Sequence, residues 1–138
     1  MNFLTGKGFL GTHLVSKLSD ITAIPHDKIQ STVLKPFNFF FYLSSYGNMS
    51  FHSKSDKIIK ANVLDLANII EKAVRFPFKS FVFISTSSVK LRIQTMYSRS
   101  KKAAEEILLA YMEKYNLPIC IVRPTTIYGL NEQPQHLI

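Results

Sequence analysis

Cysteine, acidic residues and long apolar runs are all scarce in this 138-residue chain. The single cysteine, Cys120, excludes a disulfide framework and a cysteine-based zinc site, and it suits a reducing compartment. The longest apolar stretch, FNFFFYL, is too short to cross a bilayer. The first residues, MNFLTGKGFLG, lack the basic segment and apolar core of a signal peptide. We therefore expect a cytoplasmic protein with no membrane partner.

Acidic side chains number 9 against 17 lysines and arginines, which gives a net charge of +8. The basic residues are spread along the chain without a run of five, and no zinc-finger or RNA-recognition signature accompanies them. This distribution argues against a dedicated nucleic-acid binder, whereas a surface for phosphorylated small molecules fits the charge. The four histidines show no metal-ligand spacing, so we expect no metal site.

Short apolar segments alternate with amphipathic ones, which is typical of strand–helix–strand units. The length is that of one domain spanning 1–138. These features predict an α/β fold: a Rossmann-like, doubly wound parallel sheet in three α/β/α layers, with ligands at the carboxyl ends of the strands. The expected strands are 1–5, 21–24, 39–43, 80–84 and 119–122, and the expected helices are 12–18, 56–74 and 95–115.

A glycine turn, TGKGFLG, follows the first strand and opens the first helix. Gly6, Gly8 and Gly11 have the G-x-G-x-x-G spacing, in which the glycines permit a tight turn, a close approach to pyrophosphate and close helix–strand packing. The backbone N–H groups at the helix start, around Phe9 and Leu10, would face the phosphates. A turn without a ligand is the alternative, and we favour the dinucleotide site because three of only 5 glycines have this spacing.

The end of the second strand should carry the acidic partner of the ribose hydroxyls. Asp27 is the candidate there, although it lies one or two positions late and His26 and Lys28 flank it. A basic neighbour can also accept the extra phosphate of NADP. The choice between NAD and NADP therefore stays open.

The segment STSSVKLRIQTMYSRSK places Tyr97 and Lys101 four residues apart, on one face of the expected helix. A single Tyr-x-x-x-Lys arises easily by chance. An exposed basic helix face beside Arg99 and Lys102 is the alternative interpretation. The surrounding motifs decide between them.

Taken in order, six segments resemble the NAD-dependent epimerase/dehydratase family, the extended short-chain dehydrogenases/reductases, many of which act on nucleotide sugars. TGKGFLG resembles the opening glycine motif of the family, and YSRSK its Tyr-x-x-x-Lys pair. The other four are FFFYLSSYGN, ANVLDLANII, FVFISTSSV and RPTTIYG. The resemblance implies an oxidoreductase core with NAD or NADP as cofactor and a nucleotide sugar as substrate.

The resemblance also assigns residues near the cofactor besides the glycine turn and Asp27. Tyr97 and Lys101 are among them. The remaining residues that it assigns are Leu43, Ser44, Ser45, Asn62 and Pro124. For Asn62, the alternative role is to cap the start of a helix.

In the chemistry that this resemblance implies, Tyr97 is a general base while a sugar C4 gives hydride to the nicotinamide. Lys101 and the positively charged nicotinamide would lower the pKa of the phenol. Thr86 would orient the same substrate hydroxyl, although a turn cap is its simpler role. The 4-keto sugar would then be epimerised, dehydrated or reduced.

Three features depart from the family pattern. The segment between Gly11 and Phe41 is too short for a third strand and its helix, and only ten residues separate Thr86 from Tyr97. We also expect the carboxyl-terminal substrate domain to be missing, so that the domain is incomplete and the isolated chain binds cofactor weakly and turns over slowly, if at all. A non-catalytic dinucleotide-binding or regulatory module is the alternative. Family members often dimerise through two helices, here 56–74 and 95–115.

Overall fold

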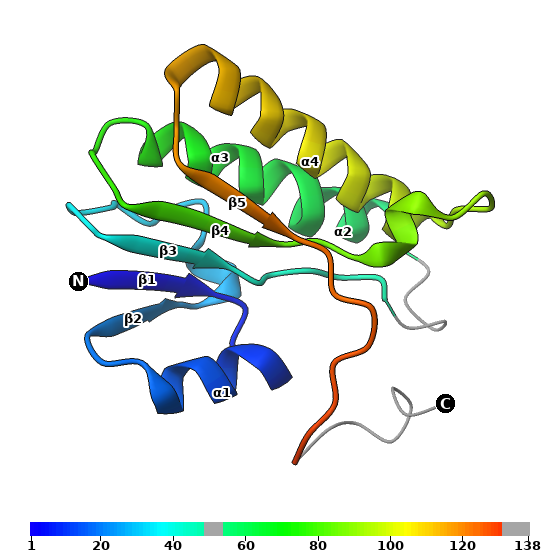
Figure 1. The fold of residues 1–138 in the computed structure, drawn as a ribbon, viewed down its shortest axis with the longest axis horizontal. Helices are drawn as coiled ribbons and strands as arrows, with labels where there is room; N and C mark the ends of the chain where they lie inside the picture. Colours follow the sequence, from blue (N-terminus) through cyan, green and yellow to red (C-terminus); the bar gives the residue numbers. More distant parts are fainter. Residues whose placement is uncertain (49–53, 131–138) are drawn as a thin grey trace.

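The computed structural model describes residues 1–48 and 54–130, and its centre is a five-stranded parallel sheet (Figure 1). The strand order β2-β1-β3-β4-β5 places the first strand beside the third in sequence. All four strand pairings are parallel, which confirms the predicted doubly wound arrangement. The strands are β1 (Asn2–Thr5), β2 (Ile21–Ile24), β3 (Phe39–Tyr42), β4 (Ser80–Ile84) and β5 (Ile119–Val122).

Helices cover both faces of the sheet, as expected for three layers (Figure 1). Helix α1 (Phe9–Lys17) packs against the face that carries Leu4, beside Gly11. The other face is covered by α2 (Ser55–Ile59), α3 (Asp65–Ala73) and α4 (Met96–Tyr115). None of the helices in the described part of the chain is long and apolar enough to span a membrane.

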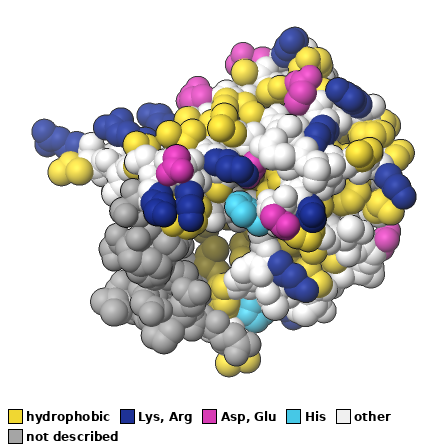
Figure 2. Space-filling view, turned by 180° about the vertical axis from the view of Figure 1, so that it is seen from behind, with side chains coloured by type: hydrophobic (Ala, Val, Ile, Leu, Met, Phe, Trp, Pro, Cys, Tyr) yellow, Lys and Arg dark blue, Asp and Glu magenta, His cyan; other side chains and the backbone are white. Residues whose placement is uncertain are grey.

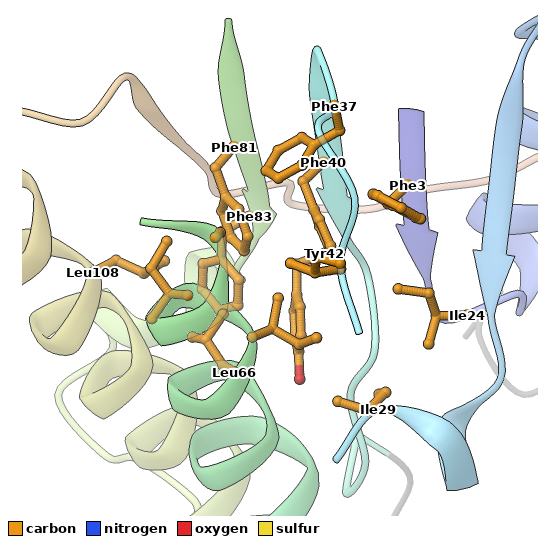
Figure 3. Close-up of a cluster of buried hydrophobic side chains, with 14 of the residues drawn as sticks. Phe3, Ile24, Ile29, Phe37, Phe40, Tyr42, Leu66, Phe81, Phe83 and Leu108 are labelled. Atoms are coloured by element: carbon orange, nitrogen blue, oxygen red, sulfur yellow. The ribbon is translucent and has the colours of Figure 1, made fainter. Parts of the chain in front are cut away.

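The core lies between the sheet and helices α3 and α4 (Figure 3). Because side chains alternate along a strand, Phe40 and Tyr42 share the inner face of β3, and Phe81 and Phe83 that of β4. Phe40 stacks on Phe81 with ring centroids 5.0 Å apart. Each such buried side chain stabilises the fold by about 1.5–3 kcal/mol. Leu66, Ile69, Ile70, Ala104 and Leu108 complete this layer from the helices.

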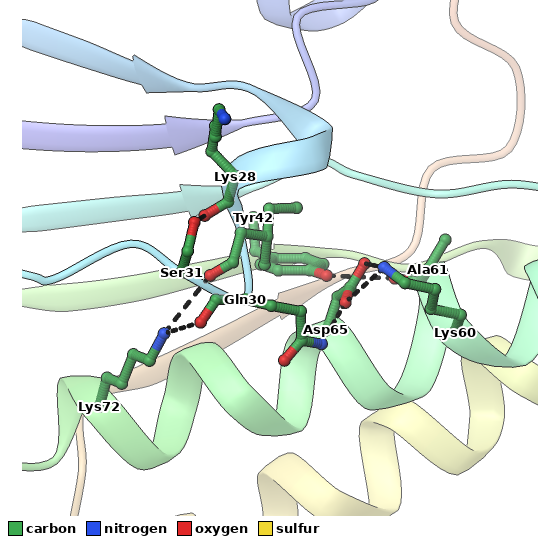
Figure 4. Close-up of polar contacts among 9 residues, drawn as sticks. Lys28, Gln30, Ser31, Tyr42, Lys60, Ala61, Asp65 and Lys72 are labelled. Atoms are coloured by element: carbon green, nitrogen blue, oxygen red, sulfur yellow. Dashed lines mark hydrogen bonds and ion pairs between the residues drawn. The ribbon is translucent and has the colours of Figure 1, made fainter.

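No strand forms between β2 and β3, as the short segment length predicts. Apart from a 3-10 turn at His26–Lys28, residues 25–38 are irregular. The Lys72 ammonium of α3 holds this segment by donating to the carbonyl oxygens of Gln30 at 2.7 Å and Thr32 at 2.9 Å (Figure 4). Gln30 also donates to the fully buried Asp65. These contacts satisfy backbone groups that a third strand would otherwise pair.

The expected helix over 56–74 is interrupted by a π-helical turn at Lys60–Leu64, between α2 and α3. π-Helical turns are rare and are frequent at functional sites. The turn carries Asn62, which is fully buried. Periodicity does not show this interruption, because the aliphatic spacing continues through the turn.

Lysine and arginine side chains lie scattered among apolar and acidic ones over the face shown in Figure 2. The net charge of +8 is therefore distributed over the surface seen there. This arrangement matches the spread of basic residues along the sequence, which contains no run of five.

Candidate cofactor and catalytic site

The glycine turn lies at the carboxyl end of β1, where two of its glycines are required by close contacts. Gly6 has φ +81°, and a Cβ there would lie 2.5 Å from the backbone nitrogen of Ser44. A Cβ on Gly11 would lie 2.1 Å from the carbonyl oxygen of Gly6. Any side chain at either position would collide with backbone, so the turn presses the helix onto the strand and onto the loop after β3.

Gly8 differs from both, because a Cβ there would meet no atom of the described residues within 4 Å. Gly8 is the N-cap of α1; no side chain caps this helix end, and no acidic residue lies in its first turn. The first backbone N–H groups, at Phe9 and Leu10, lack an intrahelical acceptor and carry the positive end of the helix dipole. The open space in front of Gly8 therefore fits an anionic group such as pyrophosphate.

Asp27 lies in the 3-10 turn just after β2, with its side chain 75% exposed. Its only ion pair among the described residues is with Lys28 at 3.9 Å, which is a weak surface contact. The carboxylate is thus available to accept hydrogen bonds from hydroxyl groups. The adjacent lysine keeps a phosphate partner equally close, so this end of the site does not separate NAD from NADP.

The loop after β3 joins the glycine turn to the rest of the site. Leu43 continues the strand by donating its N–H to Thr5 at 3.1 Å, and the Leu43 and Ser44 backbone lies against Gly6. Ser44 is buried, and its hydroxyl has no hydrogen-bond partner within residues 1–48 and 54–130. The Ser45 side chain lies near the phenol of Tyr97 and favours its ionised form. One loop therefore contacts both the glycine turn and the tyrosine.

Asn62 holds this loop in place. Its amide oxygen accepts from the backbone N–H of Tyr46 at 2.8 Å, and its amide nitrogen donates to the Tyr46 carbonyl oxygen at 2.8 Å. The same nitrogen donates to the Ser100 hydroxyl of α4 at 2.9 Å. Asn62 lies inside the π-helical turn, so the alternative of a helix cap is wrong. Both donor hydrogens of the side chain are already used within the protein.

Helix α4 begins with a capping box, in which Thr95 and Ser98 bind each other's backbone N–H groups. This start places Tyr97 in the first turn, with a half-buried side chain. Burial raises the pKa of Tyr97, and the nearby Ser45 side chain opposes that effect only in part. The chain by itself therefore holds Tyr97 as a phenol at neutral pH.

Lys101 lies one helical turn further along and is only 1% exposed. Its ammonium donates to the carbonyl oxygen of Ile84, the last residue of β4, at 2.6 Å and lies 4.3 Å from the centre of the Phe83 ring. Burial lowers the pKa of Lys101 to about 7, with the carboxylate of Glu105 opposing the effect. The alternative of an exposed basic helix face is wrong for this residue.

Thr86 follows β4 and caps the 3-10 turn Ser87–Lys90. Its hydroxyl oxygen accepts from the backbone N–H of Ser88 at 3.2 Å and lies 3.1 Å from the Ser88 hydroxyl. These are the contacts expected if Thr86 only caps a turn. Pro124, after β5, accepts a hydrogen bond from the Ser87 N–H at 3.1 Å, so the segments after β4 and β5 are joined at this end of the sheet.

Comparison with protein families identifies the chain. The model of the NAD dependent epimerase/dehydratase family matches residues 32–138. The chain belongs to this family. The match starts after the glycine turn. The assignment of this turn to cofactor binding therefore depends on its geometry and on the fold.

Relatives within the family carry out several reactions. A dTDP-D-glucose 4,6-dehydratase of Dictyostelium discoideum is 25% identical over 122 residues, covering 70% of this chain and 28% of the relative. A UDP-2-acetamido-2,6-beta-L-arabino-hexul-4-ose reductase of Pseudomonas aeruginosa is 24% identical over 137 residues, covering 94% of this chain and 36% of the relative. The chain thus spans about a third of the length of these curated relatives.

A solved structure confirms the fold. The UDP-glucuronic acid 4-epimerase of Bacillus cereus, in complex with NAD, superimposes with a TM-score of 0.81 at 22% identity. The superposition covers 98% of this chain and 59% of that one. The Rossmann-like sheet of this family member is therefore present here from one end of the described chain to the other.

The sequence did not point to Glu105, a buried carboxylate that lies one turn beyond Lys101. Both of its oxygens accept hydrogen bonds from Arg123: Nε donates to Oε1 at 2.9 Å and Nη2 to Oε2 at 2.6 Å. The four-residue spacing of Lys101 and Glu105 could have indicated that the two side chains are neighbours on one helix face. In the described part of the chain, no three histidine, cysteine or acidic side chains gather to hold a metal ion.

Proposed function

We propose that this chain is the core of an NAD(P)-dependent oxidoreductase of the epimerase/dehydratase type that acts on a nucleotide sugar. One observation carries the proposal: the loop after β3 contacts both parts of the site. Its Ser44 backbone lies against Gly6 of the glycine turn, and its Ser45 side chain lies near the phenol of Tyr97. A phosphate-binding turn and a proton-handling side chain are thereby held at one edge of the sheet. Membership of the family supports the same reading.

The residues that would hold the cofactor lie along this edge. Gly8 leaves room for the pyrophosphate, and the free N–H groups of Phe9 and Leu10 would donate to it. Asp27 would accept from the ribose hydroxyls, and the backbone of the loop after β3 would line the dinucleotide. When bound, the nicotinamide supplies a hydride acceptor.

Tyr97 would take the proton of the sugar hydroxyl onto its phenolate oxygen, so that a C=O bond can form at that carbon. Because burial raises the pKa of Tyr97, the phenolate needs a cation beside it. Lys101, one turn along the same helix face, supplies this charge from the protein. Thr86 would orient the hydroxyl by exchanging its contact with the Ser88 hydroxyl for one with the substrate.

A non-catalytic dinucleotide-binding module is the second candidate. One observation favours it: the Thr86 hydroxyl is engaged in capping a turn. In this reading the glycine turn still binds the cofactor, whereas Tyr97 and Lys101 only support the structure.

A homodimer through the paired helices is also part of the proposal. Helices α2 and α4 and the π-helical turn expose large aliphatic side chains although they pack against one another on their inner sides. Ile59 is 40% exposed, Leu64 54% and Leu109 40%. A second copy that pairs the same helices would cover them.

Two measurements separate these readings. The 138-residue chain is first titrated with NADH and NADPH while the fluorescence of the nicotinamide is followed; saturable binding to either supports both candidates, and its absence contradicts both. UDP- and dTDP-sugars are then added with the oxidised cofactor, and the sugar products are separated by chromatography, because an epimerase or dehydratase returns the hydride to the sugar and accumulates little reduced cofactor. A new sugar product supports the enzyme, whereas cofactor binding without any product across the panel favours the module.

A further inference from the structure

A buried row of charges continues from the candidate catalytic pair toward the end of β5. Tyr97, Lys101 and Glu105 are spaced four residues apart and therefore follow one face of α4. Lys101 is 1% exposed and Glu105 3%. Arg123 reaches the row from the segment after β5 and forms two parallel hydrogen bonds to the Glu105 carboxylate.

The surroundings of Lys101 are poor in partners for a positive charge. Within the described residues, its ammonium donates one hydrogen bond, to the Ile84 carbonyl oxygen, and lies over the face of the Phe83 ring. Tyr97 on its own helix is neutral, because burial raises its pKa. Among the described residues, Glu105 is the opposite charge that acts on Lys101. A buried ammonium with no opposite charge nearby would lose its proton.

Glu105 is equipped to stay ionised in this buried position. Burial by itself would raise the pKa of Glu105, but the hydrogen bonds and charge of Arg123, the neighbouring Ser85 side chain and the charge of Lys101 hold it below its ordinary value. A carboxylate held by a bidentate guanidinium is fixed in direction as well as in charge. The arginine itself is partly exposed, with 40% of its side chain accessible, so it carries its own charge at little cost.

We propose that Glu105, held by Arg123, is a positioning residue of this site: it keeps the buried Lys101 protonated and directed at the end of β4. The inference rests on the proposed function for its catalytic consequence, since a protonated Lys101 is what would favour the Tyr97 phenolate. The effect of the Glu105 charge on the pKa of Lys101 depends on neither cofactor nor substrate. Glu105 touches neither substrate nor cofactor in this account.

The test is the pKa of Lys101, measured by NMR on the lysine-labelled 138-residue chain without cofactor or substrate. The Lys101 signal is assigned by its absence in Lys101→Met. In Glu105→Gln, which keeps the shape but removes the charge, we expect the pKa of Lys101 to fall by about one unit or more, because an opposite charge at this spacing shifts a pKa by about 1–3 units. In Glu105→Asp, which keeps the charge, we expect a smaller fall. An unchanged pKa in Glu105→Gln overturns the inference.

A second variant covers the case in which Glu105→Gln does not fold. The double substitution Glu105→Met with Arg123→Met removes both charges and leaves no buried carboxylate unpaired, an exchange that proteins often tolerate. A fall in the pKa of Lys101 is again expected, smaller than in Glu105→Gln because the positive charge of Arg123 is removed as well. An unchanged pKa overturns the inference. Because no cofactor or substrate is present, the result is independent of the proposed function, whose own failure would appear as absent NADH and NADPH binding.

Discussion

The side chain of Asn62 binds both backbone polar groups of Tyr46, accepting from its N–H and donating to its carbonyl oxygen, each at 2.8 Å. A third bond, to the Ser100 hydroxyl at 2.9 Å, connects the same amide to α4. One buried side chain thus joins the π-helical turn, the loop after β3 and the helix that carries Tyr97.

Asn62→Ala should therefore lower the free energy of unfolding substantially. The substitution removes three hydrogen bonds, two to the backbone of Tyr46 and one to the Ser100 hydroxyl. Each is worth about 0.5–1.5 kcal/mol. We expect a total loss of roughly 2–4 kcal/mol, measured by urea denaturation followed by circular dichroism.

Asn68→Ala is the matched control, since the amide oxygen of Asn68 has no hydrogen-bond partner in the described part of the chain. It should cost less than about 1 kcal/mol. Equal losses in the two variants would show that the Asn62 contacts do not stabilise the loop.

The buried Lys101 predicts an unusual pH dependence of stability. Its pKa is lowered from the ordinary 10.5 to about 7 in the folded chain, so between these values the unfolded chain binds more protons than the folded one. The free energy of unfolding should then rise with pH from about 7 to 10, by up to about 4 kcal/mol. Urea denaturation across this range, on wild type and on Lys101→Met, gives the difference.

The methionine variant cannot titrate at this position, so the rise attributed to Lys101 should be absent from it. Other groups, such as the buried Tyr42 whose pKa is raised, contribute to both curves alike. Parallel curves for the two proteins would place the ammonium of Lys101 in solvent rather than in the core.

Tyr97→Phe tests the proton-handling role. The substitution removes the phenol oxygen, which lies near the Ser45 side chain, but keeps the ring. With a nucleotide sugar that the wild type turns over, we expect kcat to fall by at least about 100-fold, the usual size of a general-base contribution. NADH affinity should change little. Activity close to wild type would remove Tyr97 from the mechanism.

A substitution in the exposed aliphatic surface tests the dimer. Leu64→Asp combined with Leu109→Asp places two carboxylates where a second copy would pack. We expect a wild-type dimer and a monomeric variant in sedimentation velocity at micromolar concentration, with similar circular dichroism. A monomeric wild type, or a variant that still dimerises, would contradict pairing through these helices.

Much of the fold was predictable because strand patterns here are short, strongly apolar and separated by clear helical spacing. The missing third strand was predictable from segment length alone. The π-helical turn around Asn62 was not, since aliphatic residues at three- and four-residue spacing run through it as they do in an ordinary helix. The segment that replaces the third strand depends on the bonds from Lys72, a tertiary contact that no local pattern announces.

The candidate site, too, was only partly predictable from the sequence. Glycine spacing predicted which positions cannot carry a side chain, and the geometry distinguishes Gly6 and Gly11, which are sterically required, from Gly8, which faces open space. The burial of Lys101 and its partner Glu105 could not be read from a basic helix sequence. The depth of a side chain depends on how α4 sits against the end of β4, which only the assembled sheet defines.

The central claim, that the glycine turn binds a dinucleotide, is tested most directly by comparing NADH affinity in wild type and Gly8→Val. A Cβ at this position would meet no atom of residues 1–48 and 54–130 within 4 Å, so the thermal unfolding midpoint should change little. The valine would occupy the space of the pyrophosphate, and we expect the Kd for NADH to rise at least about tenfold, a loss of about 1.4 kcal/mol. Equal NADH affinity in the two proteins, or no saturable binding by the wild type, would contradict the account.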